Sequence, residues 1–434
     1  MKSPKYLLLH LCLLLCIILS FWSTLPHYKY SVFNDIKTRV VGSRLAYNQL
    51  SPYFHKYNAN VDSIALLDPY EKQQQIVNGN TVPPTLLMLL QPLHQLPFYR
   101  VVGLWFWLSY AAFFTILYWL YNFSIKHNYS NYYIAFIGSL LLLVVGWRFH
   151  VLSGQMYIFY SLLAVSSLYF FGKKNLILSA ILAGVFTAIR FPAAILFLPF
   201  MFNNKKFAYT FFATIIVLIT TSIAFYNIQV WQQYFASMQI HGLENANAIP
   251  ELLHPTFAVP NYIEGVRTFA SKELVAYIQF INADIFSVQK LLVSYNLPSN
   301  TWVLISLFLG SSIVLFGGIN YFNNGFYRSF KHQVLYSSLL FFIVDYYLPA
   351  LRFNYNFLQF LVPLAVVVFY QFKCNFVSKL LLTTGVLLNI VKLNLLPECY
   401  SIGEVLCNIA VIIILTTNKE IGRASCRERV LMPV

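Results

Sequence analysis

Long apolar runs constrain this sequence more than any other feature. Residues 6–25, 101–121, 207–226 and 302–321 each offer about the 20 residues that a helix needs to cross the hydrocarbon core of a bilayer. Inside that core, only helices and closed barrels satisfy every backbone hydrogen bond. Charged residues make up 10% of the chain, compared with roughly 25% in soluble domains. The sequence therefore predicts an all-α, polytopic membrane protein.

Shorter apolar runs raise the expected number of transmembrane helices to about twelve. The additional runs are residues 132–147, 151–171, 176–189, 191–202, 334–349, 357–372, 377–393 and 402–415. Residues 83–97 are also apolar, but the run is short and bounded by prolines, which favours an interfacial or re-entrant helix.

The lysines of the loops support this assignment of residues 83–97. If the segment does not cross, the positive-inside bias is met at Lys126, Lys173, Lys174, Lys205 and Lys206, which all fall in the cytoplasm. If it crosses, Lys173 and Lys174 move outside. We prefer the first arrangement, and the sequence leaves the second open.

Two polar segments interrupt the apolar runs, and both are expected on the outer face. Residues 26–100 form the first outer loop, with interfacial helices, and residues 227–300 form the second. The formal net charge of +15 is explained by Lys and Arg in the cytoplasmic loops. No nucleic-acid-binding motif is present, so the expected partners are membrane lipids and not nucleic acid. Residues 1–420 are expected to form a single domain.

The two ends of the chain carry expectations of their own. Lys2 and Lys5 precede the first apolar run and place the N-terminus in the cytoplasm. We expect that run to be a retained anchor and not a cleaved signal peptide, because no small-x-small cleavage site follows it. Residues 421–434 resemble the translation of a sequencing adapter, so they are excluded from the fold.

A carboxylate, Asp35, stands where the chain leaves the membrane after the first apolar run. Ile36 and Val40 follow it at helical spacing, and Ser51-Pro52 ends the pattern. Asp35 is therefore predicted at the start of a helix on the outer face. An acidic group in that place is a candidate catalytic residue. The alternative is that it only caps the first N–H groups of the helix.

Arginines beside apolar runs give the second signal. Charged side chains at membrane depth are costly, and each is a candidate for function. Arg190, in TAIRFPAA, and Arg352, in ALRFNYNF, both fall at the outer ends of predicted helices, where a guanidinium could hold a lipid phosphate. The alternative is a side chain that only reaches the headgroups. Asp345, within a predicted helix, is expected either to pair with an arginine or to line a polar cavity.

Neutral side chains of the outer face give weaker signals. Gln155 follows a glycine at a predicted helix start, where its amide could bind a sugar hydroxyl or cap the turn. Tyr355 lies near Arg352 and is a candidate for the same substrate pocket. His241 and His254 of the second outer loop are candidates for acceptor binding, although a solvated surface position explains a lone histidine more simply.

No motif indicates a metal ion, a nucleotide or another cofactor. The sequence lacks a Walker A motif, a Rossmann glycine fingerprint, an HExxH motif and a serine nucleophile elbow. The six cysteines do not have the spacing of a metal or redox site. No cofactor is expected, and an enzyme of this kind would take an activated substrate from the membrane itself.

The order of these features resembles the GT-C integral membrane glycosyltransferases, and among them glycosyltransferase family 87, the polyprenol-phosphate-mannose-dependent mannosyltransferases of bacterial envelopes. The resemblance covers roughly residues 1–240. Its motifs are Asp35, Ser51-Pro52-Tyr53, Pro83-Pro84, Gly154-Gln155 and the basic Arg190 before Phe-Pro. It implies a polyprenyl-phosphate sugar as donor, an envelope glycan or glycolipid as acceptor, and a site on the outer face of the bacterial cytoplasmic membrane.

The resemblance also implies roles for residues. Asp35 matches the catalytic carboxylate of the first loop, which would act as general base in an inverting, metal-independent transfer. Arg190 matches the basic residue that would hold the donor phosphate, with Arg352 as a second candidate. This sequence departs from the family pattern in two places: Thr81-Val82 replaces a tyrosine before Pro-Pro, and Arg190 replaces a lysine. Both departures leave the sugar open.

Two other functions fit a polytopic chain with charged residues at membrane depth. A lipid or polysaccharide transporter would be expected to show internal repeats and a charged central path. An O-antigen ligase or polymerase would act on similar lipid-linked sugars, with its large loop late in the chain. The long outer loops and Asp35 favour the glycosyltransferase over both.

Overall fold

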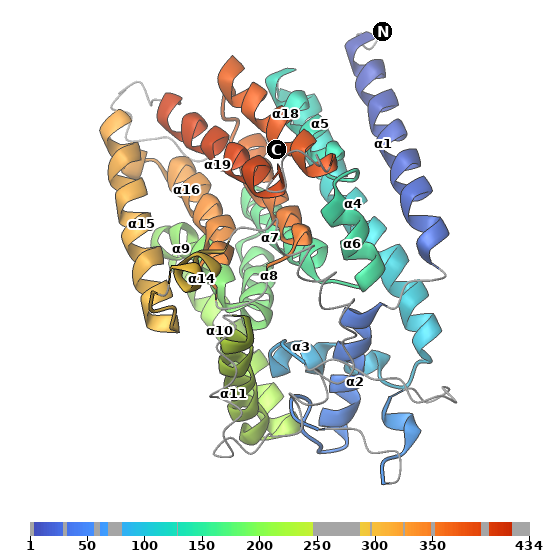
Figure 1. The fold of residues 1–434 in the computed structure, drawn as a ribbon. Coiled ribbons are helices and arrows are strands. Elements are labelled where there is room, and N and C mark those ends of the chain that lie inside the picture. Colours follow the sequence, from blue (N-terminus) through green and yellow to red (C-terminus); the bar gives the residue numbers. More distant parts are fainter. Residues whose placement is uncertain are drawn as a thin grey trace.

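The computed structural model describes residues 4–28, 33–55, 61–67, 80–127, 129–245, 287–295, 297–323, 326–348, 352–391 and 399–418. All regular secondary structure within these ranges is helical, as expected (Figure 1). His254 and the presumed adapter residues 421–434 lie outside them.

Several helices are long and apolar enough to span a bilayer. Within the described residues five meet this condition, or six if the bent pair α5 and α6 counts as one span. The five are α1 (Pro4–Tyr28), α4 (Phe98–His127), α10 (Lys205–Tyr226), α15 (Thr301–Phe322) and α19 (Cys399–Thr417). A polytopic membrane protein is therefore confirmed, whereas the number of about twelve crossings stays a prediction.

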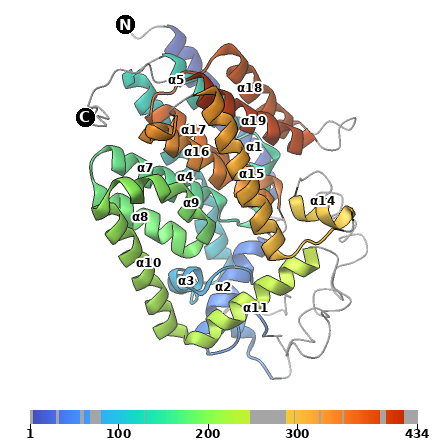
Figure 2. The same ribbon diagram turned by 90° about the vertical axis from the view of Figure 1, so that its left-hand side faces the viewer.

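The remaining helices of the bundle are shorter and pack among the long ones. They are α5 (Tyr129–Leu140), α6 (Val145–Ser153), α7 (Tyr157–Gly172), α8 (Leu176–Ile189), α9 (Ala194–Asn203), α16 (Phe330–Ile343), α17 (Leu361–Phe369) and α18 (Phe376–Ile390). Short 3₁₀ turns join some of them: η3 (Phe191–Ala193), η5 (Phe326–Arg328), η6 (Val344–Tyr346) and η7 (Asn354–Phe360). All residues of α17 are buried, so this helix lies inside the bundle, whereas α15 lies on its outside (Figures 1 and 2). The core is rich in aromatic side chains such as Trp147 and Phe186.

Two apolar runs that were each predicted as one helix are divided differently in the structure. The run 132–147 was expected as one helix, but α5 ends at Leu140 and α6 begins at Val145, with a bend of 56° between them. A Cβ atom on Gly146 would lie 2.3 Å from the carbonyl oxygen of Asn354, so the start of α6 passes in direct contact with the η7 backbone. The run 151–171 was expected to start a helix at residue 151, but α6 continues to Ser153 and α7 begins at Tyr157.

Short helices of the polar segments gather at one end of the bundle, away from the N-terminus of α1 (Figure 1). They are α2 (Asn34–Tyr47), η1 (Ile64–Leu66), α3 (Pro84–Leu89) and η2 (Gln91–Leu93), with the longer α11 (Ile228–Asn245) beside α3, whereas α14 (Val288–Ser294) lies at mid-height of the bundle. Helix α3 has 6 residues and a length of about 9 Å, which is too short to cross a bilayer. The interfacial or re-entrant placement of residues 83–97 stays a prediction.

Candidate active site

Helix α2 places Asp35 in its first turn, as expected. The preceding residue outside the helix, Phe33, is buried and has a left-handed backbone (φ 46°), so the chain turns sharply before the helix begins. Ile36 and Val40 are fully buried and anchor one face of α2 in the core. The helix therefore holds Asp35 at the junction between the polar segments and the bundle.

Asp35 faces the connection between α6 and α7. Burial raises the pKa of its carboxyl, and three neighbours oppose that rise: the positive charge of Arg39, and hydrogen bonds with the side chains of Ser153 and Gln155. The raised pKa makes the ionised form of this carboxyl a stronger base than a carboxylate in water. It can therefore accept a proton, and a purely capping role does not require these partners.

A sharp turn presents Gln155 to this carboxylate. Gly154 ends α6 with φ 75°, a conformation that favours glycine. The indole N–H of Trp105 donates to the backbone oxygen of Gln155 across 3.2 Å. The Gln155 side chain is buried at the helix start predicted from the sequence. Its role in a substrate pocket stays a prediction.

Hydrogen bonds and ring contacts connect Gln155 to Arg190. The Gln155 amide nitrogen donates to the Tyr355 hydroxyl across 2.8 Å. The Tyr355 ring lies 5.1 Å from the ring of Tyr157, and the guanidinium carbon of Arg190 lies 5.2 Å from the Tyr157 ring and 5.3 Å from that of Tyr160. Asp35, Gln155, Tyr355 and Arg190, which the sequence suggested one by one, therefore belong to one contiguous group.

Arg190 also forms an ion pair with Asp345. Its Nη2 atom lies 2.5 Å from Asp345 Oδ1. The other carboxylate oxygen accepts hydrogen bonds from the side chains of Asn356 at 3.2 Å and Gln359 at 2.5 Å. The expectation that Asp345 pairs with an arginine is confirmed. The pairing balances a charge that would otherwise be buried alone.

Arg352 lies in a different cluster. Its Nη1 atom is 2.5 Å from Glu404 Oε2, and its guanidinium carbon lies 4.1 Å from the centre of the Tyr346 ring. Tyr346 also donates to Glu404 across 3.1 Å and accepts from Asn408 across 3.0 Å. These contacts join Arg352 to α19 and η6 and not to Asp35 or Gln155. The structure therefore does not place Arg352 in the Asp35 group.

The two histidines remain predictions. The backbone of His241 lies near the end of α11, and His254 is outside the described residues. Across the described ranges, no three His, Cys, Asp or Glu side chains come together as a metal site would require.

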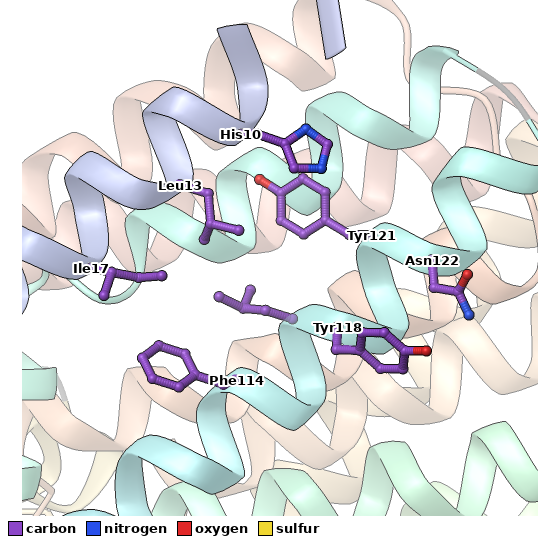
Figure 3. A pocket seen from close by; sticks show the side chains of 8 residues that line it. His10, Leu13, Ile17, Phe114, Tyr118, Tyr121 and Asn122 are labelled. Atoms are coloured by element: carbon purple, nitrogen blue, oxygen red, sulfur yellow. The ribbon is translucent and has the colours of Figure 1, made fainter. Parts of the chain in front are cut away.

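A groove lies between α1 and α4 (Figure 3). It is lined by His10, Leu13, Ile17, Phe114, Leu117, Tyr118, Tyr121 and Asn122. His10 precedes the end of α1 at Tyr28 by a rise of about 27 Å along the helix, so the groove and Asp35 are at opposite ends of α1. The groove carries no carboxylate or arginine.

Sequence reasoning missed Arg39, Tyr157, Tyr160 and Glu404. Arg39 could have been found, because it follows Asp35 by one helical turn and so shares a helix face with it. The two tyrosines and Glu404 occur in apolar helices without a local motif. Only the packing of distant segments shows their partners.

A model of glycosyltransferase family 87 matches residues 80–319, which is more than half of the chain. The match includes Gln155 and Arg190, whereas Asp35 precedes it and Arg352 follows it. Searches of curated proteins and of solved structures found no match. The chain therefore belongs to glycosyltransferase family 87, a family of GT-C-like membrane glycosyltransferases.

Proposed function

We propose that the protein transfers a hexose, with mannose as the first candidate, from a polyprenyl-phosphate sugar to an envelope glycan or glycolipid. The reaction takes place on the outer face of the bacterial cytoplasmic membrane. One observation carries the assignment of residues. Asp35 and Arg190, a base and a cation from distant parts of the sequence, are connected through Gln155, Tyr355 and Tyr157.

The transfer is a single displacement with inversion. The carboxylate of Asp35 takes the proton of an acceptor hydroxyl while the oxygen forms a bond to the anomeric carbon. The bond between that carbon and the phosphate oxygen breaks, and polyprenyl phosphate leaves with the electron pair. The pKa of Asp35, raised by burial, supports this role because it makes the carboxylate a stronger base.

Arg190 stabilises the leaving phosphate. Its guanidinium has five N–H donors, and Asp345 binds it at Nη2. Within the described structure its buried Nε has no hydrogen-bond partner, so donors remain for a phosphate oxygen. Arg352 is the weaker candidate, because it is deeply buried against Glu404 and Tyr346.

The proposal includes no metal ion and no cofactor beyond the lipid-linked donor. A phosphate is already a good leaving group, and a fixed guanidinium can balance the charge that develops on it. Activity should therefore continue in the presence of EDTA. Loss of activity on chelation, restored by one divalent cation, would contradict this part of the proposal.

The test is sugar transfer by the purified protein in nanodiscs, with a panel of polyprenyl-phosphate sugars. The Asp35→Asn variant should lose about 10²–10⁴-fold in kcat and still bind the donor, because the amide cannot accept the proton. The control is Asp62→Asn, which changes another carboxylate of the first outer segment that contacts His55 at 3.1 Å. This control should keep the wild-type rate.

Two results would overturn the proposal. Full activity of Asp35→Asn would show that the base is another residue. A folded wild-type protein that consumes no polyprenyl-phosphate sugar would exclude the donor class. No contact in the described structure specifically favours the transporter or the O-antigen ligase or polymerase.

A further inference from the structure

Arg39 makes the contacts that hold the α6–α7 turn against α2. Its Nη1 atom donates to the carbonyl oxygen of Gly154 across 2.9 Å, and its Nη2 atom donates to Gln155 Oε1 across 2.7 Å. The residue is 8% exposed. A planar fork that binds a backbone oxygen and a neighbouring side-chain oxygen together fixes both in one geometry.

The chemistry of arginine determines which way the Gln155 amide points. A guanidinium only donates hydrogen bonds, so the atom of Gln155 that faces Arg39 is the oxygen. The amide nitrogen must then face Tyr355, where it donates across 2.8 Å. The Tyr355 hydroxyl accepts this bond, and its own hydrogen is left to donate elsewhere. Asp35 is near enough to Tyr355 to act on it electrostatically.

We propose that Arg39 is a positioning residue that orients Gln155 and, through it, directs the Tyr355 hydroxyl as a hydrogen-bond donor to substrate beside Asp35. This inference rests on the proposed function, because it assigns Asp35 to the reaction. Arg39 itself touches neither the donor nor the acceptor. Its effect reaches the substrate through two successive hydrogen bonds.

The charge of Arg39 has a separate effect. It lies one helical turn after Asp35 and opposes the rise in the pKa of Asp35 that burial causes. The base must be ionised, so kcat/KM decreases as the pH falls through this pKa. Removal of the positive charge raises the pKa further, and the acid limb of the pH profile moves to higher pH.

Substitutions of Arg39 separate the effect of its two hydrogen bonds from the effect of its positive charge. Arg39→Lys keeps the charge but cannot bind both oxygens in the same plane, so kcat should fall about 10²-fold while the acid limb stays in place. Arg39→Gln removes both, so kcat should fall and the acid limb should move to higher pH. In Gln155→Glu the carboxylate can only accept a hydrogen bond, so the Tyr355 hydroxyl must donate to residue 155 and not to substrate. This substitution should also lower kcat.

Arg44→Lys is the matched control for a purely structural role. Arg44 is buried in the same helix, and its guanidinium donates to the backbone oxygens of Leu67, His94 and Leu96. Its substitution should lower the melting temperature and leave kcat and the pH profile of the folded fraction unchanged.

A double-mutant cycle between Arg39 and Tyr355 decides the question, with polyprenyl-phosphate mannose as the probe. The two side chains are connected through Gln155, so Tyr355→Phe should cost much less in the Arg39→Lys background than in the wild type. Additive losses, or an unchanged kcat in Arg39→Lys, would overturn the positioning role. If Asp35→Asn is inactive in the same assay, that result leaves the proposed function intact. If Asp35→Asn is active, the proposed function fails instead.

Discussion

Gly154 is the residue on which the geometry of the site depends most directly. Its φ of 75° is unfavourable for any residue with a Cβ atom, and a Cβ built on it would lie 2.4 Å from Cγ2 and 2.7 Å from Cβ of Ile36. The carbonyl of Gly154 also accepts the bond from Arg39. A residue without a side chain is therefore required at the point where α2 contacts the turn that carries Gln155.

The Gly154→Ala variant should be less stable and less active. The left-handed backbone alone costs about 1–2 kcal/mol, and the contact with Ile36 adds to this because the α2 backbone must move. Thermal unfolding of the purified protein measures the first effect, and sugar transfer by the folded fraction measures the second. The control is Gly310→Ala in α15, where a Cβ meets nothing within 4 Å. A Gly154→Ala protein with wild-type stability would contradict the requirement for glycine.

Local patterns were enough to predict some residues of the site. Asp35, Gln155 and Arg190 stand at helix ends, Gln155 directly after a glycine and Arg190 before Phe-Pro, and a polar residue at a helix end can be recognised without the fold. The ion pair of Arg190 with Asp345 joins residues that are 155 positions apart, so the sequence could suggest a pairing but could not choose the arginine. Glu404, the partner of Arg352, is separated from it by 52 positions and had no signal at all.

At the scale of elements, hydropathy predicted most helices because burial in lipid or in the bundle requires apolar residues in either case. The break at residues 141–144 was missed, and the run 151–171 was still expected to start a helix at residue 151, although a helix start was also predicted at Gln155. Near these breaks the backbone contacts distant segments, η7 at Gly146 and α2 at Gly154. The same apolar composition explains why the number of apolar helices does not give the number of membrane crossings. A buried helix of 14 residues such as α8 and a spanning helix have similar sequences.

Two glycines let α18 and α19 pack closely. A Cβ on Gly403 would lie 2.5 Å from the carbonyl oxygen of Gly385 and 2.4 Å from the amide nitrogen of Asn389. A Cβ on Gly385 would lie 2.5 Å from the carbonyl oxygen of Gly403. Small residues at such a crossing allow two helix backbones to approach in a membrane. Glu404 follows directly in α19, so the crossing also positions the partner of Arg352.

The Gly403→Ala variant should force the two helices apart and cost about 1–3 kcal/mol, as overpacking does in tight cores. The melting temperature in detergent should fall. The matched control is Gly317→Ala in the exposed helix α15, where the same added methyl group has no neighbour within 4 Å. Equal effects of the two substitutions would show that close packing of α18 on α19 is not what the glycine provides.

At the scale of the whole molecule, the polarity of the bundle decides which side of the membrane holds the site. Lys173 follows the last residue of α7, and Arg190 follows the last residue of α8. The two helices are in contact and are joined by a short turn, so they run in opposite directions and these residues lie at opposite ends. The positive-inside bias predicts that the Lys173 end lies in the cytoplasm, and on that prediction Arg190 and Asp35 lie outside.

Cysteine labelling in intact cells tests this orientation. In a variant without the six cysteines of this chain, Asn48→Cys after α2 and Tyr99→Cys at the start of α4 should react with a membrane-impermeant maleimide. Lys173→Cys should react only after the membrane is opened. All three positions are exposed, so protection reports the bilayer and not packing within the protein.

The pattern of labelling separates the two topologies that the sequence allows. If residues 83–97 crossed the membrane, Asn48→Cys would still react, but Tyr99→Cys would be protected and Lys173→Cys would react. If only Lys173→Cys reacted, the whole bundle would be inverted, and Asp35 would face the cytoplasm. A six-residue helix α3 is too short to cross, and α2 and α3 pack against each other at one end of the bundle. The fold therefore requires Asn48→Cys and Tyr99→Cys to give the same result, and labelling of both is the outcome that the positive-inside bias predicts.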